Sequence, residues 1–165
     1  GANSVVADPA NMDFNAIAPG TYRFTYTVSS SGACPDDSAT VEVQIDGANE
    51  AGTPTDLAIC EGDATAYDLS AQLAGEDAGG TWTDVDDAFG NGANSVVADP
   101  ANMDFNAIAP GTYRFTYTVS STGACPDDSA TVEVQIDGAN EAGTPTDLAI
   151  CEGDATAYDL SLIHI

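Results

Sequence analysis

The chain has 165 residues, of which 43% are hydrophobic, and this is enough for one sizeable core. Twenty-seven acidic residues against two arginines give a formal net charge of -25. A surface with this charge repels phosphate backbones and anionic lipids, which argues against nucleic-acid partners and against binding to membrane surfaces. No apolar run approaches the roughly 18 residues needed to cross a bilayer, so membrane insertion is not expected.

The main feature of the sequence is an internal repeat. Residues 1–70 recur at 92–161, an offset of 92 − 1 = 91 residues, with Ser31 against Thr122 as the single difference. A fixed period of this length matches one small β-sandwich domain rather than a solenoid unit. The match then ends, and the tail Leu162–Ile165, which contains the only histidine, His164, is expected to be extraneous to the repeat and is assigned no role.

The linkers indicate where each repeat begins and ends. Pro54 and its copy Pro145 each follow a polar, glycine-containing stretch that is typical of a linker. We therefore expect residues 48–138 to form one complete repeat. The flanking segments are expected to be the C-terminal half of a preceding repeat and the N-terminal start of a following repeat, residues 1–47 and 139–165. The chain is thus expected to be a stretch of a longer array.

The complete repeat is expected to contain many short strands. In chain order, the first of them are expected at 57–59, 64–69 and 81–83. Two longer stretches, 112–119 and 130–136, alternate apolar and polar residues with a period of two, which is typical of half-buried strands. Glycine and proline occur throughout, and no segment has a sustained helical periodicity. These features predict an all-β fold, an antiparallel β-sandwich.

The two longer stretches are expected to form a hairpin across the loop that begins at Ser120. If Tyr117 lies opposite Val132, Arg114 lies diagonal to Glu133 on the solvent face. An exposed pair of this kind contributes about 0.5 kcal/mol, so Arg114 is expected to serve strand register more than stability. The core anchors are expected to be Trp82, Tyr113, Phe115 and Tyr117.

Taken as a set, several motifs resemble a known family. They are Ile59-Cys60-Glu61-Gly62, Gly80-Thr81-Trp82, the run Pro110–Val119, Cys125-Pro126 and Ser129–Val132. The set is similar to the immunoglobulin-like or PKD-like tandem repeats of large secreted adhesins from gliding bacteria of the Bacteroidetes type, and the similarity covers the complete repeat and both partial ones. The resemblance implies an immunoglobulin-like sandwich, export to the cell surface, and a role in adhesion or as a spacer.

The cysteines are relevant to whether the protein lies inside or outside the cell. Four cysteines occur, two in each period of 91 residues: Cys34 in the first partial repeat, Cys60 and Cys125 in the complete repeat, and Cys151 in the last partial repeat. Their spacing fits no usual zinc site, and four cysteines allow three pairings. Position within one complete repeat favours a disulfide between Cys60 and Cys125, in keeping with an acidic, lysine-free extracellular protein. Two alternatives stay open: the pairs Cys34–Cys60 and Cys125–Cys151, which would join neighbouring repeats, or four free thiols.

We expect no catalytic site. The acidic residues fall in turns and linkers, and the repeat contains no histidine or lysine to act as a base and no Ser-His or Cys-His arrangement. The sequence therefore favours a structural or adhesive repeat, a spacer or stalk of a secreted or cell-surface bacterial protein. Its expected partners are the neighbouring repeats of the same chain and a cell-surface or glycan ligand.

Calcium or glycan binding is the alternative function. Asp84, Asp86 and Asp87 place carboxylates close together in an expected loop, and Ca²⁺ prefers such oxygen ligands, although the spacing departs from the EF-hand pattern. Further candidate ligands are Asp127, Asp128, Asp137 and Glu141. These acids would otherwise cap turns and solubilise loops. An exposed Trp82 would suit glycan stacking, whereas a lone tryptophan of an immunoglobulin-like sandwich is expected in the core.

Overall fold

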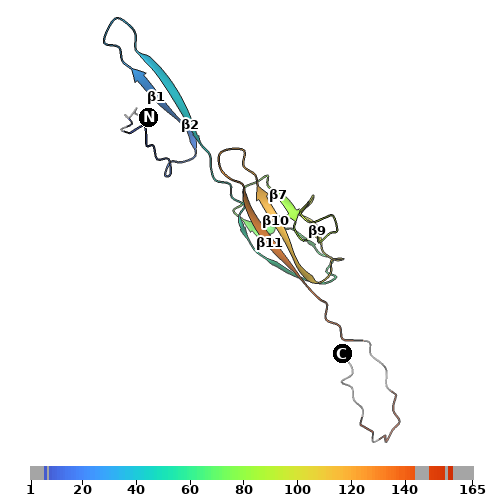
Figure 1. Ribbon diagram of the computed structural model, residues 1–165. Coiled ribbons are helices and arrows are strands. Elements are labelled where there is room, and N and C mark those ends of the chain that lie inside the picture. Colours follow the sequence, from blue (N-terminus) through green and yellow to red (C-terminus); the bar gives the residue numbers. More distant parts are fainter. Residues whose placement is uncertain (1–5, 7, 144–148, 155, 158–165) are drawn as a thin grey trace.

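A computed structural model describes residues 6, 8–143, 149–154 and 156–157 of the chain. Pro145 and the tail Leu162–Ile165, with His164, lie outside these residues. Figure 1 shows a hairpin at one end of an elongated molecule, formed by β1 (Gly20–Val28) and β2 (Asp37–Ile45), followed by a central body that comprises residues 51–137. The strands of the central body are β3 (Thr53–Pro54), β4 (Leu57–Cys60), β5 (Ala66–Tyr67), β6 (Leu73–Ala74), β7 (Thr81–Asp84), β8 (Ser95–Val96), β9 (Met103–Asp104), β10 (Gly111–Val119) and β11 (Asp128–Asp137).

The predicted all-β class is confirmed, since the only helical element in the described part of the chain is a single 3₁₀ turn at Ser70–Gln72. A five-stranded sheet has the order β4-β11-β10-β7-β8, and two small ladders pair β3 with β6 and β5 with β9. These sheets enclose one core, which is consistent with a β-sandwich. The expected purely antiparallel pairing is wrong at one place: β4 runs parallel to β11. The long connection between these two strands permits that crossover.

The core lies entirely between Ala51 and Ile136 among the described residues. Alternate side chains of β10 and β11 point inward, as the period of two requires. Phe115 is fully buried and meets the ring of Phe105 edge-on, with the centroids 5.8 Å apart. Trp82 and Tyr117 are buried in ring contact at 5.3 Å, and Tyr113 is partly buried at the margin of the core.

The register of β10 and β11 differs by two residues from the expected one. Phe115, rather than Tyr117, lies opposite Val132, and Arg114 lies directly opposite Glu133. A shift of one residue would turn the apolar side chains to the solvent, but a shift of two leaves them on the same face. The alternation therefore predicted the face of each strand correctly and left the register undetermined.

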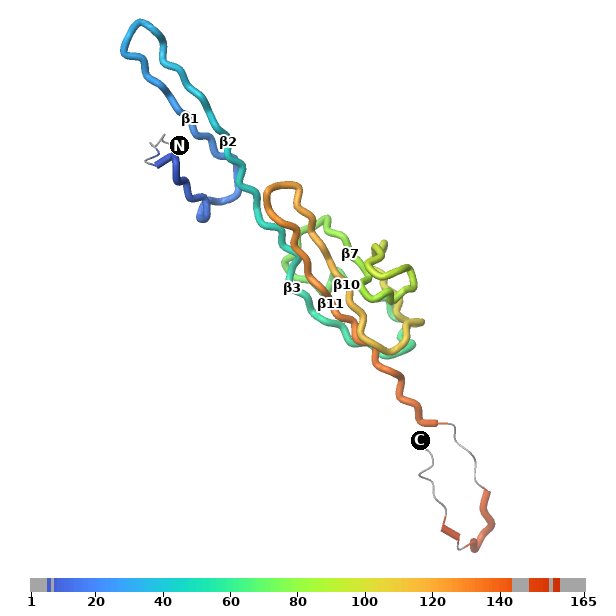
Figure 2. Tube along the Cα trace, in the orientation of Figure 1, coloured from blue at the N-terminus to red at the C-terminus, as the bar shows by residue number. Residues whose placement is uncertain are grey.

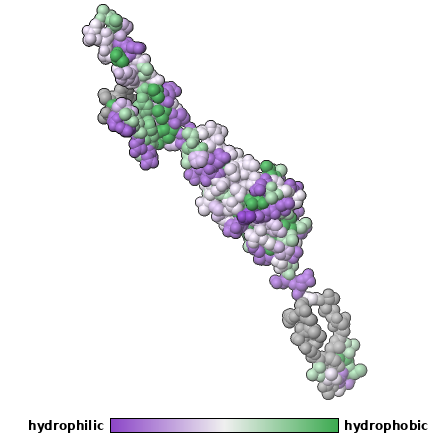
Figure 3. Space-filling view, viewed as in Figure 1, coloured by the Kyte–Doolittle hydropathy of each residue, from purple (hydrophilic) through white to green (hydrophobic). Residues whose placement is uncertain are grey.

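The β1–β2 hairpin repeats the β10–β11 hairpin in sequence and in register. Gly20 lies opposite Ile45, and their copies 91 residues later, Gly111 and Ile136, are paired in the same way. The two hairpins differ in burial. Tyr26 is 72% exposed, whereas its copy Tyr117 is 7% exposed, because only the second hairpin is covered by the other strands of a repeat. Figure 3 shows apolar surface along the first hairpin.

Candidate functional site

The candidate functional site is the contact between the linker and a loop of the central body. We call it the joint and define it as residues 46–51 together with the loop 120–127 and Asp128. The linker between β2 and β3 passes beside the loop that connects β10 and β11 (Figure 2). The Ala124 N–H donates to Asp46 Oδ2 at 2.9 Å, and Cys125 Sγ lies 3.5 Å from the Asp46 carbonyl oxygen. A Cβ atom on Gly123 would lie only 2.2 Å from Asp46 Oδ2, so glycine is needed for this close approach.

The rest of the linker is held by further hydrogen bonds to the central body. Asn49 Nδ2 donates to the Pro126 carbonyl at 2.7 Å, and the Ala51 N–H donates to Asp128 Oδ2 at 2.8 Å. Asp77 bonds Glu50 twice: its N–H donates to the Glu50 carbonyl at 2.7 Å, and its Oδ2 accepts from the Glu50 N–H at 3.0 Å. The linker is therefore fixed on both sides of residue 50 rather than tethered at one point.

The repeat supplies an internal comparison for these contacts. Ala51 is fully buried, whereas its copy Ala142 is exposed. Gly123 meets Asp46, whereas nothing lies within 4 Å of a Cβ atom built on its copy, Gly32. The sequences around each pair are nearly identical, so the differences arise from the segments that lie nearby. Gly123 meets Asp46 of the preceding linker, whereas Ala51 is buried and bonded by residues that follow it in the central body.

The predicted calcium ligands Asp84, Asp86 and Asp87 do not converge. Asp84 is 1% exposed and accepts a hydrogen bond from the Phe89 N–H at 3.2 Å, while its Oδ1 has no hydrogen-bond partner. Asp87 Oδ1 accepts from the Gly92 N–H at 2.7 Å. No group of three or more histidine, cysteine or acidic side chains in the described ranges could hold a metal ion.

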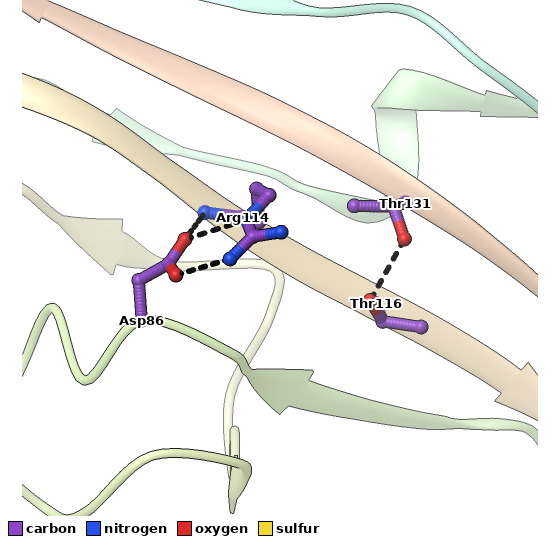
Figure 4. Close-up of polar contacts among 4 residues, drawn as sticks. All are labelled: Asp86, Arg114, Thr116 and Thr131. Atoms are coloured by element: carbon purple, nitrogen blue, oxygen red, sulfur yellow. Dashed lines mark hydrogen bonds and ion pairs between the residues drawn. The ribbon is translucent and has the colours of Figure 1, made fainter.

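Asp86 is engaged by an arginine (Figure 4). Arg114 Nη2 lies 2.7 Å from Asp86 Oδ1, and the Arg114 Nε and backbone N–H groups both donate to Asp86 Oδ2, at 3.0 and 2.9 Å. The hydrogen bond from Arg114 holds the pKa of the Asp86 carboxyl below its usual value. The expected partner Glu133 is therefore replaced by Asp86. In the first hairpin the copy, Arg23, pairs with Glu42.

The other acidic candidates stabilise turns and the joint. Asp127 Oδ1 accepts from the Ser121 N–H at 2.8 Å, which closes the loop at its base. Asp128 holds the linker, as described above. Asp137 Oδ1 lies 3.4 Å from Gln135 Nε2, and Glu141 is exposed. Asp127 and Glu141 therefore lie in a loop and a linker, where the alternative interpretation placed them, whereas Asp128 and Asp137 are the end residues of β11.

The structure does not bring Cys60 and Cys125 together, and all four cysteines are free thiols. Cys60 lies opposite Asp137 at the end of β11, whereas Cys125 precedes Asp128 at its beginning. At the usual rise per residue this separation is about 30 Å, whereas a disulfide requires Cα atoms about 4–7 Å apart. The parallel direction of β4 is the reason, because it carries Cys60 away from the loop.

The two alternative pairs are not formed either. Cys34 lies in the loop between β1 and β2, at the end of the hairpin that points away from the linker, whereas Cys60 lies at the far end of the central body. Cys125 lies in the loop before β11, against Asp46 at the opposite end of the body, and Cys151 follows β11 in the chain. None of the disulfides expected from the sequence is therefore formed among these four cysteines.

Trp82 offers no stacking surface for a glycan. Its side chain is 5% exposed and packs on Tyr117. A cavity of about 170 Å³ adjoins these two rings and is also lined by Ser70, Leu73, Glu76 and Ala78. The indole therefore contributes to the core, where the architecture predicts it.

Comparisons with protein-family models, with curated proteins and with solved structures give no match for this chain. No helix among the described residues is long and apolar enough to span a membrane. The functional assignment accordingly rests on the contacts above. Among them, the contacts of Asp46 and Asp77 at the joint were missed by sequence reasoning. The only available signal was the recurrence of the same acidic linker at the start of each repeat.

Proposed function

We propose that this chain is a structural spacer: a stretch of immunoglobulin-like repeats of about 91 residues, joined by stiff joints, in a stalk or adhesin on the outer surface of a bacterium. The observation that carries the proposal is the hydrogen-bonded joint. Asp46, beyond the end of the first hairpin, is bonded to the loop between β10 and β11, and Asn49, Glu50 and Ala51 are bonded to residues that follow them in the chain. A flexible tether would need none of these bonds.

Near-identity of the repeats supports a spacing role. Two copies that differ at one position in 70 present the same linker and the same loop to their neighbours. Each joint is then built from the same contacts, so the direction of the chain changes by the same amount at every step. A catalyst has no need of such regularity, and we propose that the chain has no enzymatic activity.

The composition supports an extracellular place for this spacer. A lysine-free chain with a net charge of -25 stays soluble, and the salt of an external medium screens its self-repulsion. Neighbouring repeats of the same chain are its proposed partners, and a cell-surface or glycan ligand would be bound by other parts of the parent protein.

Calcium binding is the second candidate function, and one observation favours it. Asp84 Oδ1 is buried without a partner, which is costly for a carboxylate unless a cation lies nearby. The residue borders a hollow of about 320 Å³ that Asp99, Asn102 and Asp104 also line. We rank this function second, because the described carboxylates do not assemble into a ligand set.

Amide hydrogen exchange tests the stiff joint. The Ala124 N–H, bonded to Asp46, is expected to exchange more slowly than the N–H of its copy, Ala33, in the loop of the first hairpin. Gly123→Ala should displace Asp46 and speed exchange of the Ala124 N–H, whereas the matched variant Gly32→Ala should change nothing at the joint. Equal exchange at Ala124 and Ala33 would show that Asp46 does not hold the loop and would refute the proposal.

A further inference from the structure

The first step concerns the position where a repeat ends. In the parallel ladder of β4 and β11, Cys60 lies directly opposite Asp137. The next residue, Glu61, donates its N–H to the Asp137 carbonyl at 2.7 Å. Cys60 is exposed at this point. One end of the central body therefore presents a free thiol beside the last residue of its last strand.

The second step concerns the same position one repeat earlier. Asp46 is the copy of Asp137, because 46 + 91 = 137. Cys125 Sγ lies 3.5 Å from the Asp46 carbonyl oxygen. The last residue of the hairpin thus has two kinds of neighbour. Asp137 is paired with the end of β4 in its own repeat, and its copy Asp46 is contacted by the loop thiol of the repeat that follows.

The third step joins these views in a continuous array. A repeat that ends at Asp46 would carry its own copy of Cys60 opposite Asp46, at the spacing of neighbouring strands, about 4.8 Å. Cys125 of the next repeat is already in contact with Asp46. The two cysteines therefore approach the same residue, Asp46, one from the neighbouring strand and one from the loop of the next repeat.

We infer that each joint of the array is closed by a disulfide between the first-strand cysteine of one repeat (Cys60) and the hairpin-loop cysteine of the next repeat (Cys125). The inference rests on the proposed array of repeats. The partner of Cys60 is the copy of Cys125, at 125 + 91 = 216, and the partner of Cys125 is the copy of Cys60, at 60 − 91 = −31.

The bond forms by thiol–disulfide exchange with a low-molecular-weight disulfide, for which glutathione disulfide is the probe. One cysteine thiolate attacks the probe, forms a mixed disulfide and releases one glutathione. The second cysteine thiolate then displaces the other glutathione. The two cysteines together lose two protons and two electrons, and the probe is reduced to two thiols.

The test uses the full chain preceded by a copy of residues 48–91, which completes the repeat that ends at Asp46 and adds one cysteine, the copy of Cys60. Treatment with glutathione disulfide is expected to lower the free thiols from five to three. Peptide mapping should then show the added cysteine linked to Cys125. Cys125→Ser in the extended chain should abolish the link, and the original chain should form no disulfide between its own four cysteines.

Three outcomes would overturn the inference: a link from the added cysteine to Cys34 in its own repeat, a link between Cys34 and Cys60, or no link at all. Amide exchange at Ala124 separates the two proposals, because a protected Ala124 without the disulfide leaves the stiff spacer standing, whereas an unprotected Ala124 removes both.

A second measurement needs no added residues. In the original chain, Cys125 lies partly covered against Asp46, whereas its copy Cys34 is exposed. Alkylation by iodoacetamide is therefore expected to be several-fold slower at Cys125 than at Cys34. The local sequences are almost the same, so equal rates would mean that the loop does not contact Asp46, and the inference would fail.

Discussion

Removal of one hydroxyl from the core, by Tyr117→Phe, should destabilise the central body. Tyr117 Oη donates to the Asp77 carbonyl at 2.7 Å and accepts from the Gly80 N–H at 2.8 Å. The residue is 7% exposed, so the phenylalanine variant leaves both backbone groups without this partner. At about 1 kcal/mol for each hydrogen bond, the loss is about 2 kcal/mol. For a cooperative unit of this size, this corresponds to a fall in Tm of about 8–16 °C.

Urea unfolding followed by tryptophan fluorescence measures this loss. Trp82 is the only tryptophan of the chain and lies against Tyr117, so the signal reports the central body alone. Tyr26→Phe is the matched control, because Tyr26 is the copy of Tyr117 and is 72% exposed. It should change stability by less than about 0.5 kcal/mol. The reasoning is refuted if the two variants lose the same stability, or if Tyr117→Phe loses none.

Three further predictions use the same fluorescence signal. The pKa of Asp86 is lowered in the folded state by Arg114, so the stability that this carboxylate contributes is present above its unfolded pKa of about 3.9 and is lost as the pH falls through the folded value. In Asp86→Asn, the free energy of unfolding should therefore fall less steeply as the pH is lowered, whereas Glu42→Gln in the first hairpin should leave this pH dependence unchanged. Asp84→Asn should unfold at a higher urea concentration than the original chain, because a neutral amide costs less to bury than a carboxylate with one unpartnered oxygen; unfolding at a lower concentration would contradict this. Sodium chloride should raise the Tm by screening the net charge of -25, and CaCl₂ at equal ionic strength should raise it no further; a larger rise that Asp84→Asn abolishes would support the calcium function.

The sequence predicted the local features of the fold. Alternation in 112–119 and 130–136 located the two long strands and the faces they bury, and Gly79-Gly80 marked the start of the strand that holds Trp82. The register was missed by two residues, because an alternating pattern is the same after such a shift. The strand expected at 64–69 is paired only at Ala66–Tyr67.

The sequence did not predict which strands become neighbours. The four residues Leu57–Cys60 look the same whether they pair in parallel or antiparallel fashion, and only the tertiary fold places them beside β11. The error in the expected disulfide follows from this, since it assumed that Cys60 lies near the loop. The contact between Asp46 and Cys125 joins residues 79 apart in the chain, and no local pattern signals it.

The parallel pairing of β4 with β11 has a mechanical consequence. The chain enters the central body at one end and leaves it at the other; β4 is the second strand after the point of entry, and β11 is the last strand before the exit. Tension along a stalk would pull β4 and β11 in opposite directions along their own axes. The bonds between the four residue pairs, from Val134 and Leu57 to Asp137 and Cys60, would then bear the force together in shear, and would not open one after another.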